Sequence, residues 1–313
     1  MSAGMRLGRS AGNDAGMNAV TSVGTSVGIS AVLAALDAAT APVRFFIRDD
    51  DAGWDDARLF ALLRCTEGAR VPIDLALIPQ ATGAALAAQL GACVDGAGGR
   101  VGLHQHGHAH SNFEPTGRKC EFGPSRDLQA QRRDLIAGRE HLHTLFGARL
   151  DAFFTPPWNR CSDATPGLLA ELGYTGLSRD RSAPVQQALP ELRVDVDWCR
   201  HQRLADGRDE SRDEARGEAG GEALGDAIGL DLARHVHGGA TVGLMLHHAQ
   251  MGDAELDWLG RALSNWARHP NARWRPMREL MPAPTYAPAR PEPLPPLGEG
   301  WDGGRPAPHK ETT

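Results

Sequence analysis

Short apolar segments alternate with amphipathic helical segments along most of this chain. The apolar segments carry few polar side chains at alternate positions, which is typical of strands buried on both faces. This alternation predicts a parallel sheet covered by helices, as either a barrel or a doubly wound sheet. The expected strands are 43–47, 73–78, 100–104, 151–155, 192–196 and 241–246, and the expected helices are 55–69, 83–94, 128–146, 165–172, 227–236 and 254–266.

Composition divides the chain into one folded domain and three less structured segments. The 313 residues, 41% of them hydrophobic, are enough for one large core. We expect that core within residues 42–282. Residues 1–41, rich in Gly, Ala and Ser, are predicted to be a disordered leader, and residues 283–313 a disordered Pro- and Gly-rich tail. Residues 200–222, dense in charge, are predicted to be a solvated insertion.

Charge and cysteine usage limit the partners and the compartment. A net charge of −6 offers no basic face for nucleic acid. The apolar stretch near the N-terminus is broken by polar residues and glycines, so we expect neither an export signal nor a membrane span. Five scattered cysteines without a CxxC pair favour a reducing compartment, and we predict a cytoplasmic protein. The sequence indicates no particular oligomeric state.

Polar clusters follow five of the expected strands. In α/β proteins of this kind, active sites gather at the carboxyl ends of the strands. These clusters could therefore converge on one site. They are Arg48-Asp49-Asp50-Asp51, the histidine-rich run from His104 to Asn112, the run from Phe153 to Arg160 with two prolines, Asp195-Val196-Asp197-Trp198, and Leu244-Met245-Leu246-His247-His248.

The carboxylates and histidines of the first two clusters indicate a metal ion. Adjacent carboxylates repel one another and are best tolerated beside a cation, although a solvated turn or a helix N-cap would also suit aspartates. Histidines four apart lie on one face of a helical turn, where two imidazoles can reach one ion. The pairs His104/His108 and His106/His110 both have this spacing. The alternative is a histidine-rich surface tract that binds metal incidentally.

The five clusters, taken in order, resemble the motifs of the polysaccharide deacetylase family of carbohydrate esterases. The resemblance covers about residues 43–250. It implies a distorted, incomplete (β/α) barrel of mainly parallel strands in a single domain. It also implies a metal-dependent hydrolase that removes an acetyl group from an N-acetylated sugar or glycan.

The resemblance also implies a role for individual residues. Asp50 matches the general base and His247 the catalytic acid. The metal ligands would be Asp51, His106 and His110. Trp158 would offer its backbone N–H to the oxyanion, and the residues that line the substrate site would be Trp158, Asn159, Asp197 and Trp198.

Two positions depart from the family pattern or leave its register open. The family places an arginine just before the two prolines, where it pairs with the base, and this chain has Thr155 there. Arg48 or Arg160 could substitute for it. Asp49 and Asp50, in place of Asp50 and Asp51, could form the pair of base and ligand.

The metal and the substrate are predicted only by class. Imidazole and carboxylate ligands suit Zn²⁺ best, with cobalt, manganese and nickel as alternatives. Aromatic rings near the clusters, among them Trp54, would suit a carbohydrate substrate, although tryptophans are equally common as core residues. Two other functions fit the residues: a cytoplasmic amidase of the same fold that acts on a small ureide or cyclic amide, and a non-catalytic protein that binds metal or carbohydrate.

Overall fold

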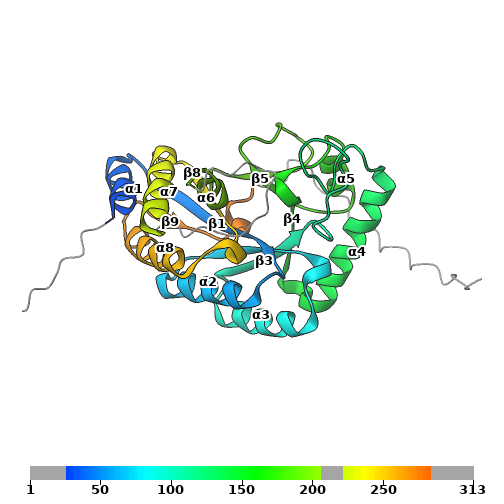
Figure 1. The fold of residues 1–313 in the computed structure, drawn as a ribbon, viewed down its shortest axis with the longest axis horizontal. Coiled ribbons are helices and arrows are strands. Elements are labelled where there is room, and N and C mark those ends of the chain that lie inside the picture. Colours follow the sequence, from blue (N-terminus) through cyan, green and yellow to red (C-terminus); the bar gives the residue numbers. More distant parts are fainter. Residues whose placement is uncertain (1–25, 206–220, 283–313) are drawn as a thin grey trace, which may run out of the picture.

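The structure, a computed structural model, describes residues 26–205 and 221–282. Within these residues it contains nine strands and nine α-helices (Figure 1). The strands are β1 (Val43–Ala52), β2 (Ile73–Leu77), β3 (Val101–His106), β4 (Leu150–Thr155), β5 (Gly176–Asp180), β6 (Glu191–Val194), β7 (Val196–Asp197), β8 (Thr241–Leu246) and β9 (Ala272–Trp274). The helices are α1 (Val27–Ala38), α2 (Asp56–Ala69), α3 (Ala84–Gly96), α4 (Leu128–Phe146), α5 (Thr165–Glu171), α6 (Trp198–Ala205), α7 (Gly221–His235), α8 (Asp253–Trp266) and α9 (Met277–Leu280).

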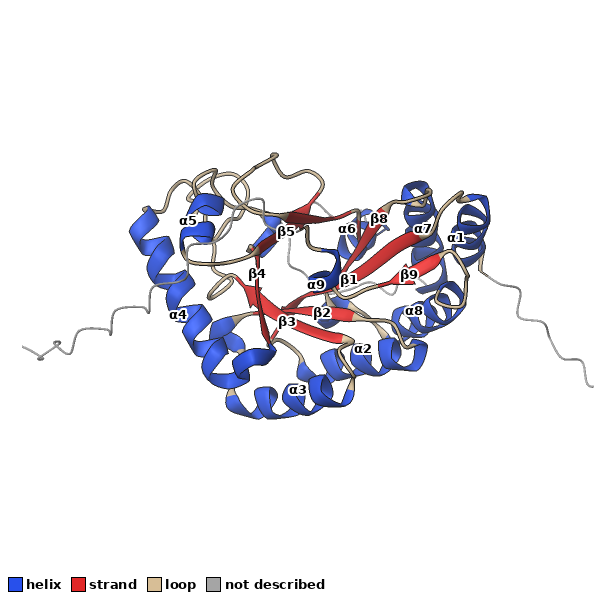
Figure 2. Cartoon of the chain, turned by 180° about the vertical axis from the view of Figure 1, so that it is seen from behind, coloured by secondary structure: helices blue, strands red, loops and turns tan. Residues whose placement is uncertain are grey.

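The strands form a nearly closed parallel barrel. Their order is β6-β5-β4-β3-β2-β1-β8-β7, and β9 pairs with the first residues of β1. Helices surround the strands, with α1, α7 and α8 on one side and α4 and α5 on the other (Figures 1 and 2). The predicted distorted (β/α) barrel in a single domain is confirmed. Among the described residues, no helix is both long and apolar enough to cross a bilayer.

The predicted leader is wrong in its second half, because residues 27–38 form helix α1 on the outside of the barrel. Glycines allow α1 to approach α7 closely: a Cβ added at Gly28 would lie 2.7 Å from the Cα of Asp226. The Asp226 carboxylate also accepts the Gly28 N–H at 2.9 Å. Small residues that suggest a disordered segment are here the contact surface of a helix. Residues 1–25 lie outside the described residues.

Two other predicted segments change or fall outside the description. The charged insertion was expected at 200–222, but α6 continues to Ala205 and α7 begins at Gly221. Residues 206–220 lie outside the described residues, as does the predicted tail at 283–313. The predictions also missed the short elements β5, β9 and α9, which have too few residues for a clear periodic pattern.

The alternation of side chains along β1 directs every second residue into the barrel. Phe46 packs there with apolar residues from β4, β6, β8 and α9. Phe45 and Ile47 face outward into the larger core between strands and helices. By the same two-residue period, Arg48 and Asp50 continue the inward face above Phe46. The inward side chains from the first part of β1 therefore pack inside the barrel, and those from its last part place charged groups at the carboxyl-terminal end.

A buried carboxyl group at the opposite end of the barrel predicts a pH-dependent stability. Asp74 on β2 is 1% exposed, and its Oδ1 has no hydrogen-bond partner. Burial raises its pKa from 3.8 to about 7, against the opposing effect of the Met277 N–H bonded to its carboxylate. The folded chain thus holds this proton where the unfolded chain releases it. Stability should therefore fall as the pH rises from about 4 to about 7, by at most about 4 kcal/mol.

The Asp74→Asn variant removes this titration. We expect it to gain stability at pH 8 relative to the parent and to flatten the decline between pH 4 and 7. Urea unfolding across that range measures both effects, with the exposed Asp163→Asn as the control. A slope that survives in Asp74→Asn would show that other groups cause the decline.

Candidate active site

The three consecutive aspartates do not share one direction, because a β-bulge interrupts the end of β1. The register between β1 and β2 shifts between Asp49 and Ala52. Asp51 adopts a left-handed conformation with φ of 66°. A bulge of this kind re-aims side chains and occurs often beside active sites. Asp50 and Asp51 consequently both reach the carboxyl-terminal mouth of the barrel, whereas Asp49 turns away.

Asp49 is occupied by His248, which favours Asp50 and Asp51 over Asp49 and Asp50 as the pair of base and ligand. The His248 backbone N–H and ring Nδ1 lie 2.9 and 2.6 Å from the Asp49 carboxylate. The other ring nitrogen lies 2.6 Å from the Trp54 carbonyl oxygen. Burial lowers the pKa of His248, but Asp49 outweighs this and raises it, consistent with a doubly protonated ring that donates to both acceptors. Asp49 and His248 thus hold the loop that carries Trp54, and Asp50 and Asp51 remain for chemistry.

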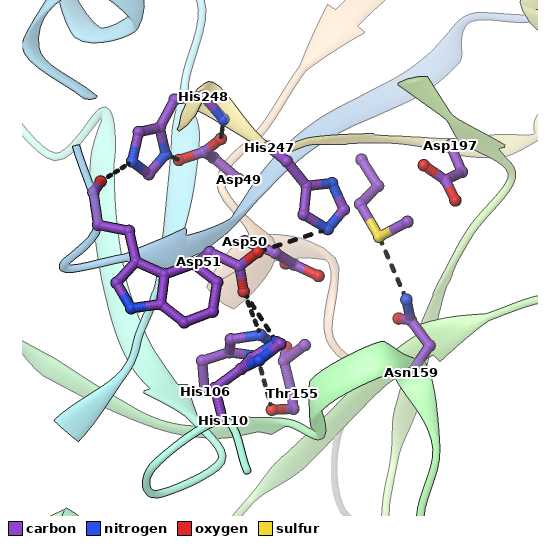
Figure 3. A network of polar contacts seen from close by, with 12 residues as sticks. Asp49, Asp50, Asp51, His106, His110, Thr155, Asn159, Asp197, His247 and His248 are labelled. Atoms are coloured by element: carbon purple, nitrogen blue, oxygen red, sulfur yellow. Dashed lines mark hydrogen bonds and ion pairs between the residues drawn. The ribbon is translucent and has the colours of Figure 1, made fainter. Parts of the chain in front are cut away.

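Asp51, His106 and His110 converge on one point (Figure 3). Nε2 of His106 and Nε2 of His110 each lie 3.1 Å from Oδ1 of Asp51. The predicted trio is therefore brought together. The expected helical turn is wrong: His106 ends strand β3, and His110 lies in the following loop with φ of 55°.

The loop from β3 to His110 is shaped by a glycine and a buried glutamate. Gly107 has φ of 58°, and a Cβ there would approach the Pro157 ring to 2.5 Å. The Glu121 carboxylate accepts the backbone N–H groups of His108 and Ala109 at 3.1 and 2.8 Å. Glu121 is fully buried. It thereby fixes the turn that returns His110 to the mouth of the barrel, a role without any signal in the sequence.

Thr155, which stands where the family has an arginine, orders two histidines instead. Its carbonyl oxygen lies 3.0 Å from Nδ1 of His106 and accepts the proton of this nitrogen, while Nε2 lies 3.1 Å from Oδ1 of Asp51. Its hydroxyl lies 2.8 Å from Nε2 of His104. Burial lowers the pKa of His104 to about 3, so this ring is neutral. His104 is a structural neighbour of the trio.

The missing arginine is replaced by Arg48, three residues before Asp51. Its Nε and Nη2 bind the two carboxylate oxygens of Asp50 at 2.8 and 2.9 Å. Ser178 and Asn159 accept two further guanidinium protons at 2.7 and 2.6 Å. Burial raises the pKa of Asp50, but Arg48, His106 and His247 together outweigh this and keep it below its ordinary value. Arg160, the other candidate, donates to the Lys119 carbonyl instead.

His247 stands on the other side of the aspartates from His106 and His110 (Figure 3). Its Nε2 lies 4.0 Å from Oδ2 of Asp51. Burial lowers the pKa of His247, but Cys199, Asp51 and Asp50 raise it well above its ordinary value. An imidazole whose pKa is raised beside a carboxylate pair is suited to donate a proton to a reacting group.

Two of the predicted substrate contacts have side chains that are engaged within the protein. Trp198 is fully buried within the core between strands and helices. Its ring packs edge-on against that of Trp258, with 6.0 Å between the ring centroids. Asn159 uses its amide oxygen for Arg48 and its amide nitrogen for the Met245 sulfur at 3.3 Å. Through these contacts it orders the guanidinium group of Arg48. An Asp-x-Trp segment or an Asn beside an aromatic residue cannot reveal from sequence which side chain faces inward.

The aromatic rings that do reach the mouth are those of Trp54 and Trp158. The ring centroid of Trp54 lies 4.8 Å from that of His110, and the two rings meet edge-on. The ring centroid of Trp158 lies 4.4 Å from that of His110, and these two rings are tilted relative to each other. Trp54 is 42% exposed. Trp158 has φ of 55° in the turn after β4. The two tryptophans thus flank the Asp-His-His cluster with apolar surface.

Several site residues were absent from the prediction. Ser178 supports Arg48 from β5, a strand that the sequence pattern did not reveal. Met245 contacts Arg48 from β8. Cys199 lies close to His247 and is the third member of a second group of possible ligands, discussed below. Ser178 lies in the middle of β5, Met245 one residue before the end of β8, and Cys199 two residues beyond β7, so no shared strand-end position marks all three.

Comparisons with known proteins identify the fold. Neither a family model nor a curated protein matches the sequence. Among solved structures, a protein of Mycobacterium smegmatis assigned by name to the polysaccharide deacetylases superposes with a TM-score of 0.50 at 14% identity, covering 81% of this chain and 99% of that one. A probable polysaccharide deacetylase of Pseudomonas aeruginosa PAO1 gives 0.50 at 12% identity, covering 77% and 90%. Puue allantoinase gives 0.50 at 12%, covering 77% and 89%.

These likenesses and the strand order define the chain as a (β/α) barrel with a carboxylate and imidazole cluster at its carboxyl-terminal mouth. More particularly, its fold is that of the polysaccharide deacetylases, in agreement with the resemblance of its five motifs.

Proposed function

We propose that this chain is a metal-dependent hydrolase that removes an acetyl group from an N-acetylated sugar or glycan. The observation that carries the proposal is the meeting of Asp51, His106 and His110 beside two further groups, Asp50 and His247, that are not needed to hold an ion. Binding alone would require neither a base nor an acid. This favours catalysis over a non-catalytic metal- or carbohydrate-binding protein.

The residues present fit a divalent ion. Atoms that share an ion at about 2.0–2.2 Å lie roughly 3–3.5 Å apart, and Nε2 of His106 and of His110 each lie 3.1 Å from Oδ1 of Asp51. The proton on Nδ1 of His106, directed at the Thr155 carbonyl, leaves Nε2 free to bind a cation. Two imidazoles and one carboxylate suit Zn²⁺, with Co²⁺, Mn²⁺ and Ni²⁺ as alternatives. A bound ion of this kind lowers the pKa of water and polarises a carbonyl.

The protein groups around that position divide the proton transfers between them. Asp50, kept ionised by Arg48, accepts the proton of the attacking water. His247, on the other side of Asp51, delivers a proton to the departing amine nitrogen, which is a poor leaving group without one. The backbone N–H of Trp158 stabilises the oxyanion, a contact typically worth about 3–4 kcal/mol.

The surroundings of the site support a sugar as the substrate. Trp54 and Trp158 lie on two sides of His110, and Trp54 exposes a large part of its ring. An apolar ring face of this kind stacks against the C–H face of a pyranose. Asp197, at the end of β7, is the polar member of the predicted substrate contacts that is not buried. We retain it as a candidate contact to sugar hydroxyls.

A second candidate function is hydrolysis of a small ureide or cyclic amide. It is favoured by the likeness of the fold to Puue allantoinase, which superposes as well as the polysaccharide deacetylases do. It is also favoured by Thr155 at the position of the family arginine. The same base, acid and ion would serve either amide.

Release of acetate from N-acetylated sugars, measured against release of ammonia or ring opening from ureides, separates the two. The Zn²⁺-loaded full chain is used, with the Asp51→Asn variant as the background control. Acetate release that exceeds the control supports the deacetylase. Turnover of ureides alone supports the amidase, and metal binding without turnover of either class supports a binding protein.

A further inference from the structure

Next to the proposed active site, a second group of three possible ligands meets around a cysteine. The ligand atoms of Asp197, Cys199 and His247 all lie within 4.8 Å of one another. The sheet register brings them together: Asp197 on β7 pairs with Met245 on β8. Two residues beyond each of these lie Cys199, in the first turn of α6, and His247, after the end of β8. The cluster is therefore a consequence of strand pairing.

The two nitrogens of His247 face different groups. Nε2 is directed at Asp51, at 4.0 Å (Figure 3). Nδ1 is buried, and it has no conventional hydrogen-bond partner among the described residues. A buried ring nitrogen requires a partner, and the Cys199 thiol is the group placed beside this ring to supply one. Cys199, which is 1% exposed, lies near enough to the ring to interact with it electrostatically.

The donor set has a distinct chemistry. A thiolate, an imidazole and a carboxylate together select Zn²⁺, Co²⁺ or Cd²⁺ over Mg²⁺ or Ca²⁺. Ligand atoms around Zn²⁺ in tetrahedral geometry lie about 3.3–3.8 Å apart, so shifts of about 1 Å would suffice to close this cluster. The Asp-His-His trio contains no sulfur, and the two clusters can be distinguished by that difference.

We infer that Asp197, Cys199 and His247 form a second site for a thiophilic divalent ion, which withdraws His247 from catalysis when it is filled. The thiol proton of Cys199 leaves to solvent as the metal–sulfur bond forms. The loss of catalysis rests on the proposed function, whereas the binding itself does not.

The second site should be the weaker of the two. Binding has to displace the Cys199 proton, and Asp197 already accepts the Arg200 N–H at 3.2 Å and lies 3.5 Å from Nη2 of Arg203. An ion would have to compete with both donors. We therefore expect occupation only when metal exceeds one equivalent, so that excess Zn²⁺ inhibits the enzyme.

The test loads the full chain with one equivalent of Zn²⁺ and then adds Co²⁺ or Cd²⁺. The wild type is expected to develop a near-ultraviolet band of thiolate-to-metal charge transfer, with an end point of one further equivalent. Cys199→Ser should lack this band. Cys65→Ser, which removes a partly buried thiol elsewhere in the chain, should retain this band. Asp197→Asn should show a weaker band and bind the added metal with at least tenfold lower affinity. This variant replaces Cys199→Ser in the test if Cys199→Ser does not fold.

Two results would overturn the inference. One is the absence of a thiolate band in folded wild-type protein, and the other is a band of full strength in Cys199→Ser. Inhibition supplies an independent measurement once a substrate is known: Cys199→Ser should need at least tenfold more Zn²⁺ than the wild type for half inhibition. Failure to find any substrate would count against the proposed function and leave the spectroscopic result standing.

Discussion

The Asp50→Asn variant is expected to lose about 10²–10⁴-fold in kcat while it still binds one metal ion. Asparagine has the shape of aspartate but cannot accept the proton of the attacking water. Asp50 faces Arg48 and not the two histidines that meet Asp51, so the substitution leaves the Asp-His-His cluster in place. Steady-state turnover and metal content are measured on the same preparation.

The matched control for this prediction is Asp163→Asn, which makes the same chemical change at an exposed position away from the site. It should retain both turnover and metal. An Asp50→Asn variant with turnover close to wild type would exclude Asp50 as the base. A variant that lost its metal would instead indicate that Asp50 helps to hold the ion.

The Arg48→Met variant is expected to be strongly destabilised at neutral pH. Arg48 is fully buried and Asp50 is 1% exposed, so the substitution removes the bidentate ion-pair partner of a buried carboxylate. Removing one partner of a buried ion pair typically costs about 3–5 kcal/mol. Urea unfolding at several pH values measures this cost.

The sign of the pH dependence follows from Asp50. In the wild type its folded pKa is lowered, so the pair contributes stability above the unfolded pKa that is lost as the pH falls. Without Arg48, burial raises that pKa. The difference in the free energy of unfolding between variant and wild type should therefore be largest at high pH and decrease toward pH 4.

The same substitution should alter the pH–rate profile. With the pKa of Asp50 raised, the acid limb of kcat/KM should move to higher pH, because a protonated carboxyl cannot act as the base. Arg48→Lys keeps the charge without the two parallel bonds and should give an intermediate shift. Arg160→Met is the control, since Arg160 contacts a backbone carbonyl elsewhere. If the acid limb of kcat/KM were unchanged in Arg48→Met, the ion pair with Arg48 could not be the cause of the low pKa of Asp50.

The sequence predicted the barrel and the meeting of distant residues because both depend on simple periodicity. Strands that alternate with helices must form a parallel sheet, and the ends of its strands must share one edge. Asp51, His106 and His110 could therefore be grouped before any coordinates were known. Their identification as a set of ligands, however, came from the family resemblance and not from their spacing.

What the sequence could not predict depends on the direction of single side chains. Three adjacent aspartates look equivalent in sequence, but one left-handed residue at Asp51 separates Asp49 from the other two. Trp198 follows a site residue and yet points into the core. Helix α1 was missed because it follows a stretch rich in Gly, Ala and Ser, and because Gly28, which permits close contact with α7, lowers the helical signal.

The central claim is that Asp51, His106 and His110 hold one catalytic ion, and metal retention tests it most directly. Each chain is loaded with Zn²⁺ and dialysed against metal-free buffer before its metal content is measured. Wild type, Asp50→Asn and the neighbouring His108→Ala should retain one ion per chain. Asp51→Asn, His106→Ala and His110→Ala should retain less than about a tenth as much. One ion per chain in all three of these folded variants would contradict the assignment.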